Sequence, residues 1–94
     1  MDIRYSKIAL KTLQRYDRKT RERLRSKIYG LTKEPPEGDI KPVKGRESIF
    51  RLRVGKYRVL FEYLSDEVIK EDCRINSNIA LLIIDVDTRG DIYQ

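Results

Sequence analysis

The stretch of sequence that decides the fold is residues 48–63, which reads SIFRLRVGKYRVLFEY. Apolar and polar residues alternate on both sides of Gly55-Lys56, as in two strands that each bury one face. Glycine at the first position of a two-residue loop is typical of a type II′ turn. The sequence therefore predicts a β-hairpin in which Val54 pairs with Tyr57, Arg53 with Arg58, Leu52 with Val59, and Arg51 with Leu60.

The two faces of this hairpin differ in chemistry. Like charges directly opposite each other on a sheet are destabilising, yet one face carries Arg51, Arg53 and Arg58. Guanidinium groups match phosphate oxygens two at a time, so this cluster predicts a phosphate-binding surface. The alternative is a closed ion-pair network with Glu62, Asp85 or Asp87. The other face is expected to form a core, and it carries Phe50, Leu52, Val54, Tyr57, Val59, Phe61 and Tyr63.

The residues before the hairpin predict one strand and two helices. Residues 2–6 alternate polar and apolar side chains, as in a short strand. Ser6 and Asp17 are candidate N-caps, each followed by apolar residues at helical spacing, and Gly30 falls near the end of the second helix. These two helices are expected to form a hairpin with an apolar inner face and a basic outer face.

The remaining segments complete an α+β fold. Residues 34–39 predict a turn and residues 40–45 an extended connector. Residues 65–78 are mostly polar and predict a loop, with a short strand at 68–69 as an option. Residues 79–86 are the most apolar run and predict a buried central strand. We expect one domain over 1–94, with about four strands in total, an antiparallel sheet and both helices on one face.

Charge is concentrated in the first two thirds of the chain. The whole sequence has a net charge of +6, but residues 1–60 hold 18 Lys and Arg against 7 Asp and Glu, a balance of +11. Such a block favours a polyanionic partner, nucleic acid in particular, because bound phosphates release counterions. The alternative is a well-solvated helix surface.

Composition excludes several classes of protein. With no histidine and the single Cys73, a His/Cys zinc site, a histidine base and an internal disulfide framework are excluded. No apolar run reaches about 18 residues, and the N-terminus lacks the apolar stretch of a signal peptide. We therefore expect a cytoplasmic protein without a membrane partner.

Three segments carry a resemblance to a known family: Lys44-Gly45, the run from Phe50 to Phe61, and the stretch TRGDIY at 88–93. Together they resemble the RelE/ParE superfamily of bacterial and archaeal toxins, and the resemblance covers nearly the whole chain. It implies a RelE-like toxin that a cognate antitoxin wraps and neutralises. In the RelE branch the toxin enters the ribosomal A site and cuts mRNA, using the RNA 2′-hydroxyl as nucleophile and no metal or other cofactor.

The resemblance also implies which residues act. Well-studied RelE members carry lysines at the positions of Arg51 and Arg53, one of them a candidate base. Arginine cannot be deprotonated in proteins, so the base here would be Tyr93, a carboxylate such as Glu47 or Asp87, or a ribosomal group. Catalytic roles fall on Arg51, Arg53, Arg58, Arg89 and Tyr93. RNA-binding roles fall on Lys44, Arg18, Arg21, Arg25 and Lys56.

Two other functions stay open on the sequence. One is a ParE-like toxin that inhibits DNA gyrase without cutting RNA, because the family's lysines are absent and Asp87 stands within the cluster. The other is a superfamily member that has lost activity. In each toxin reading we expect a monomeric toxin and an acidic antitoxin that docks through an amphipathic helix or strand.

Overall fold

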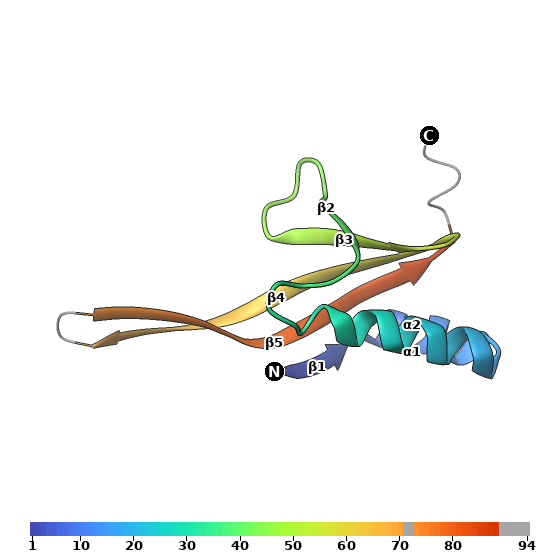
Figure 1. The fold of residues 1–94 in the computed structure, drawn as a ribbon, viewed down its shortest axis with the longest axis horizontal. Helices are drawn as coiled ribbons and strands as arrows, with labels where there is room; N and C mark the ends of the chain where they lie inside the picture. Colours follow the sequence, from blue (N-terminus) through green and yellow to red (C-terminus); the bar gives the residue numbers. More distant parts are fainter. Residues whose placement is uncertain (71–72, 89–94) are drawn as a thin grey trace.

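The predicted hairpin lies within a five-stranded sheet that two helices cover on one face (Figure 1). A computed structural model describes residues 1–70 and 73–88. The strands lie in the order β1-β5-β4-β3-β2, and all neighbours are antiparallel except β1 and β5. The elements are β1 (Asp2–Tyr5), α1 (Lys7–Arg15), α2 (Arg18–Gly30), β2 (Asp39–Pro42), β3 (Ile49–Val54), β4 (Tyr57–Lys70) and β5 (Cys73–Asp87).

The register of the central hairpin is the one that the sequence predicts. Val54 lies opposite Tyr57, and Arg53 lies opposite Arg58. Gly55 has a φ of +59°, whereas Lys56 does not have a positive φ. A type II′ turn requires that combination, because only its first central residue is left-handed.

The sheet has one more strand than the sequence analysis predicts. The segment expected as an extended connector contains β2, which pairs with the outer edge of β3. Pro42 fits this position because an edge strand needs no donor on its outer side. The chain enters β2 through Gly38, which has a φ of +124°, and a Cβ there would lie 2.6 Å from Leu52 Cδ1. Only glycine avoids that contact. The polar residues of this segment gave no sign of the strand.

The loop predicted for residues 65–78 is wrong. Instead, β4 and β5 continue past the other strands as a two-stranded ribbon, paired as far as Lys70 and Cys73 (Figure 1). In this register Val68 lies opposite Ile75, so residues of high β propensity share a pair. The polarity that suggested a loop also suits a ribbon that no helix covers. The ribbon gives the molecule a longest dimension of 50 Å.

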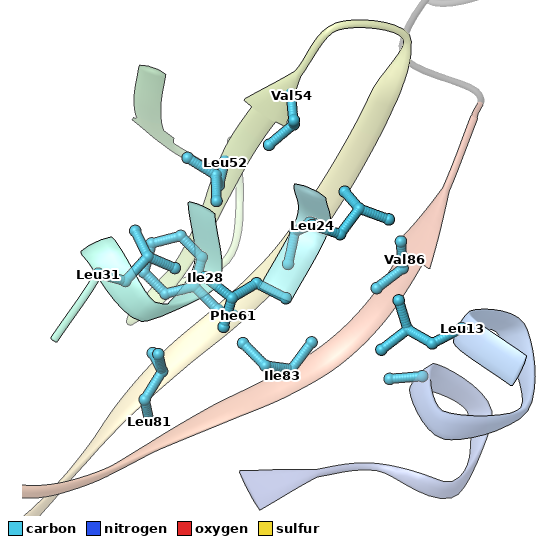
Figure 2. Packing of buried hydrophobic residues seen from close by; sticks show 12 residues of the cluster. Leu13, Leu24, Ile28, Leu31, Leu52, Val54, Phe61, Leu81, Ile83 and Val86 are labelled. Atoms are coloured by element: carbon cyan, nitrogen blue, oxygen red, sulfur yellow. The ribbon is translucent and has the colours of Figure 1, made fainter. Parts of the chain in front are cut away.

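The core lies between the helices and the apolar face of the sheet (Figure 2). Leu24 and Ile28 of α2 are fully buried against β3, β4 and β5, where Leu52, Phe61 and Ile83 are at most 1% exposed. The apolar parity predicted for the hairpin is confirmed, since Leu52, Val54, Val59 and Phe61 are buried and Phe50, Tyr57 and Tyr63 pack at the margin.

Ser6 joins the helical layer to the sheet. Its Oγ accepts a hydrogen bond from the Ala9 amide at 3.0 Å, which caps α1 as predicted. The same hydroxyl donates to the Ile84 carbonyl at 2.6 Å, and the Ser6 amide donates to the Ile83 carbonyl at 2.9 Å. Ile84 is the extra residue of a β-bulge, because Leu60 pairs with Asp85 while Phe61 pairs with Ile83. One side chain therefore satisfies both a helix end and an irregular strand.

Replacing Ser6 with alanine should lower the free energy of unfolding by about 1–2 kcal/mol, because a cap and a bonded carbonyl are lost together. Urea unfolding followed by far-UV circular dichroism measures this loss. Ser26→Ala, a change at an exposed position of α2, is the matched control and should have little effect. Equal stabilities for the two variants would contradict the role given to Ser6.

Tyr63 makes a second link between the layers. Its hydroxyl donates to the Leu31 carbonyl at 2.7 Å, at the end of α2. Burial, with a smaller contribution from the charge of Glu34, raises the pKa of Tyr63 above 10.0. The folded state therefore disfavours ionisation that the unfolded chain undergoes near pH 10. The stability contributed by neutral Tyr63 is complete below pH 10 and falls as the pH rises through the folded pKa.

Tyr63→Phe should lower the free energy of unfolding at pH 8 by about 1 kcal/mol, because the Leu31 carbonyl loses its donor. Between pH 10 and 11 the variant should lose less stability than the wild type, since its side chain cannot ionise. Urea unfolding at the two pH values tests both parts. Tyr29→Phe, at a side chain that is 61% exposed, should leave the pH dependence unchanged.

Candidate functional site

The sheet face opposite the helices carries the arginine cluster. Strand alternation buries Leu52 and Val59 and so directs Arg51, Arg53 and Arg58 to the other face. Arg53 is exposed, while Arg51 and Arg58 are partly buried. The like-charged cross-strand pair predicted from the sequence, Arg53 with Arg58, is confirmed by the register.

A hollow of about 300 Å³ lies on this face, over β3 and β4. Three arginines line it: Arg46, Arg51 and Arg58. Its other walls are apolar and consist of Pro42, Val43, Ile49 and Leu60. Cations beside apolar walls suit a ligand that combines a negative charge with a flat or aliphatic part.

Arg46 reaches the hollow from the connection between β2 and β3, which rises from the sheet in Figure 1. The base of this connection is closed by a hydrogen bond from the Val43 amide to the Ile49 carbonyl at 2.9 Å. Within it, the Arg46 amide donates to the Val43 carbonyl at 3.2 Å. The turn needs a left-handed residue at Gly45, where φ is +80°.

Two carboxylates pair with arginines of the hollow. Asp87 Oδ2 lies 3.0 Å from Arg58 Nη2, and both side chains are about four-fifths buried. Asp39 Oδ1 lies 3.6 Å from Arg51 Nη2, and its side chain is 54% exposed. The first pair was one of the alternatives open on the sequence, whereas the second was missed. Three guanidiniums and two carboxylates still leave the site with an excess of positive charge.

The other carboxylate of this strand end has a different role. Asp85 lies opposite Leu60, and its Oδ1 accepts a hydrogen bond from the Val86 amide at 2.8 Å. Burial raises the pKa of Tyr16 above its ordinary value, with smaller contributions from the charges of Tyr57, Asp87 and Asp85. The negative end of β5 thus lies close to the aromatic pair Tyr16 and Tyr57, whose ring centroids are 5.1 Å apart.

The predicted RNA-binding residues do not form one surface. Lys44 lies in the β2–β3 connection, beside the segment that supplies Arg46, and is exposed. Lys56 lies at the hairpin turn, with its Nζ 5.6 Å from the centre of the Tyr57 ring. The remaining three lie on α2, in the layer that covers the opposite side of the sheet, and they are Arg18, Arg21 and Arg25. The other two predicted catalytic residues, Arg89 and Tyr93, lie outside the described residues.

Sequence reasoning missed Arg46 and Asp39. Both depend on β2, because Asp39 reaches Arg51 across the β2–β3 ladder, where it lies opposite Arg53. The available signal was the pair of glycines, Gly38 and Gly45, which bracket the strand and its turn. Reading them as strand boundaries would have placed both residues beside the arginine cluster.

Over residues 1–70 and 73–88, no three His, Cys, Asp or Glu side chains lie together in a way that could hold a metal ion. Neither described helix is long and apolar enough to cross a membrane.

Solved structures share this fold. The RelE toxin of the RelB–RelE complex from Methanococcus jannaschii has a TM-score of 0.62 at 24% identity, over 96% of this chain and 94% of that chain. The isolated Escherichia coli RelE toxin has a TM-score of 0.67 at 16% identity, over 98% and 89%. The archaeal RelE–RelB complex from Pyrococcus horikoshii gives 0.62 at 21% identity, over 95% and 94%. At these identities the likeness shows a RelE-like fold.

The sequence itself matches a family. A comparison with the curated proteins finds no match. The sequence model of the ParE toxin of the parDE type II toxin–antitoxin system, in contrast, matches residues 3–93, nearly the whole chain. With the fold shared by RelE toxins, this match shows that the chain belongs to the ParE toxin family of type II toxin–antitoxin systems, within the RelE/ParE superfamily.

Proposed function

We propose that this toxin is an endoribonuclease that cuts mRNA in the ribosomal A site without a metal and so inhibits translation. The observation that supports this proposal is the hollow in which Arg46, Arg51 and Arg58 meet on the uncovered face of the sheet. Preorganised cations stabilise the charge that develops on a phosphate during cleavage. The apolar walls suit an unstacked nucleotide, which is how single-stranded RNA is usually read.

The proposed reaction is a transesterification. The 2′-oxygen attacks the adjacent phosphorus, and the bond from phosphorus to the 5′-oxygen of the next nucleotide breaks. The products are a 2′,3′-cyclic phosphate and a free 5′-hydroxyl. Arg51 and Arg58 would hold the non-bridging oxygens, because a guanidinium fork can donate two parallel hydrogen bonds.

A proton must leave the 2′-hydroxyl, and arginine cannot take it. We assign this step to Asp87, because its carboxylate lies beside Arg58, the arginine proposed to bind the phosphate. The ion pair would hold the acceptor oxygen close to the reacting atoms. The departing 5′-oxygen takes its proton from water. This assignment chooses Asp87 among the candidates from the sequence, which also include Tyr93, Glu47 and a ribosomal group.

A ParE-like toxin that inhibits DNA gyrase is the second candidate. Two observations favour it: the matching family is named for ParE, and two arginines of the hollow already have carboxylate partners. In that case the face would be a binding surface without chemistry. A toxin fold that has lost activity would fail both in RNA cleavage and in gyrase inhibition.

Membership of a toxin–antitoxin family indicates which partners this chain has. The RelE structures with the same fold include complexes with RelB antitoxins. We propose a cognate antitoxin for this chain, acidic in view of the net charge of +6. We further propose that the toxin is a single-domain monomer when free and acts in the cytoplasm, on the ribosome and its mRNA.

Arg58→Ala should lower the rate of mRNA cleavage about 10²–10³-fold, because one charge-stabilising group is removed. Primer extension on mRNA in a purified translation system measures this, with new 5′ ends at A-site codons expected for the wild type only. Arg4→Ala, at an exposed position of β1, is the matched control and should cut normally. Unchanged cleavage by Arg58→Ala would refute the site, whereas intact mRNA combined with inhibited gyrase supercoiling would establish the second candidate.

Asp87→Asn should lower the cleavage rate about 10²-fold or more, because the amide cannot accept the 2′-hydroxyl proton, while binding to the ribosome persists. Single-turnover cleavage and a ribosome-pelleting assay separate the two effects. Asp85→Asn serves as the control, because an amide oxygen can still accept the Val86 hydrogen bond. A faster cut by Asp87→Asn would show instead that this carboxylate shields Arg58.

A further inference from the structure

The hollow on the sheet face opposite the helices has two chemically different ends. Arg58 lies at one end, and Arg51 follows it toward the middle. Ile49 and Val43 form the other end, where the Val43 amide donates to the Ile49 carbonyl at 2.9 Å. Arg58 lies opposite Arg53, which stands four residues after Ile49 in β3, so about 13 Å separates the two ends along the strand. One nucleotide spans a comparable length from its phosphate to the far edge of its base.

Arg46 stands at the apolar end of the hollow. Its amide donates to the carbonyl of Val43, a residue of the apolar wall, at 3.2 Å. Arg51 and Arg58 each meet a carboxylate, whereas Arg46 is exposed and makes no ion pair with any residue in the part of the chain that the structure describes. Its guanidinium therefore keeps donors for a ligand that lies along the apolar wall.

The connection that carries Arg46 keeps a shape that its sequence disfavours. Ser48, the residue before Ile49, has a φ of 66°. The left-handed region is costly for a residue with a side chain, so it persists only where the surrounding structure holds it. Arg46 is thus presented from a fixed turn between two strands, and a recognition residue discriminates best when its backbone is held in place.

A base with two adjacent hydrogen-bond acceptors matches Arg46. Apolar walls suit the face of a base, and the two rings of a purine cover more of such a wall than a pyrimidine does. A guanidinium only donates hydrogen bonds, and its fork pairs best with two neighbouring acceptors. Guanine offers O6 and N7 in this arrangement, whereas adenine places an amino group beside its N7.

We infer that Arg46 determines base specificity by reading the guanine of a nucleotide whose phosphate is held by Arg51 and Arg58. The inference rests on the proposed function, because it takes that phosphate to be the one at which mRNA is cut. The base would lie against Val43 and Ile49, while the fork of Arg46 donates to O6 and N7. The toxin would then prefer mRNA sites that have a guanine beside the broken bond.

NMR titration of the free toxin with guanosine 3′-monophosphate and with cytidine 3′-monophosphate tests the inference without the ribosome. The wild type should bind the guanosine nucleotide about tenfold more tightly, which is the discrimination that one bidentate contact supplies. Arg46→Lys keeps the charge but loses the fork, so it should bind the two nucleotides about equally. Arg58→Ala should weaken both and leave their ratio unchanged. Arg4→Lys, the same change at an exposed position of β1, is the matched control. The spectra also show whether each variant is folded.

Sequencing of the cut ends in the purified translation system gives a second readout. Guanine should be enriched beside the cut for the wild type and for Arg4→Lys, whereas Arg46→Lys should still cut but lose the enrichment. If mRNA is cut and Arg46→Lys keeps the preference of the wild type, the inference is wrong and the proposed function stands. Equal binding of both nucleotides by the wild type, or a preference for cytidine, would also overturn the inference. A guanosine preference that Arg46→Lys removes, combined with intact mRNA, would support the base contact and overturn the proposed cleavage.

Discussion

Burial of one face of the β3–β4 hairpin is the constraint on which the rest of the structure depends. Leu52, Val59 and Phe61 are covered by α2, and strand alternation then leaves no choice about where Arg51 and Arg58 point. A slip of one residue would expose the core face and bury the arginines. The same packing that stabilises the fold therefore fixes the candidate site, because any change in the β3–β4 register would move the core residues and the arginines together.

The carboxylates reduce the cost of this arrangement. Arginines on adjacent positions of one sheet face repel each other, and partly buried charges are expensive without partners. Asp87 and Asp39 come from the strands on either side of the hairpin, β5 and β2, and each meets one arginine. The five-strand order thus brings a counter-charge to each margin of the cluster. An incoming phosphate would compete with these carboxylates or bind beside them. The role of Asp87 differs in the two cases, because it would shield Arg58 in the first and could accept a proton in the second.

How much the sequence predicts depends on whether the signal is local. Alternation of apolar and polar residues predicts the hairpin and its register, and helical spacing predicts both helices. The serine side chain predicts the Ser6 cap. Each of these signals lies within a few neighbouring residues. The polar segment of 65–78 could not be assigned that way, since it has no apolar alternation of its own and its strands are defined by pairing with each other. Arg46 and Asp39 were missed for a related reason. The strand that places them, β2, is only four residues long and is defined by its pairing with β3, because it has no hydrophobic pattern of its own.

The two basic surfaces lie on opposite sides of the sheet, and this separation constrains how a partner could regulate the toxin. A helix bound between α1 and α2 would contact Arg21 and Arg25 but would not reach Arg51 and Arg58, which the whole thickness of the core separates from it. Such a helix would supply affinity without covering the hollow. Blocking the hollow would need a second segment of the same partner that passes around a sheet edge, at β2 or along the β4–β5 ribbon. Linking two weak contacts in this way raises the effective concentration of the second, so a partner that contacted both sides of the sheet would need no single tight site.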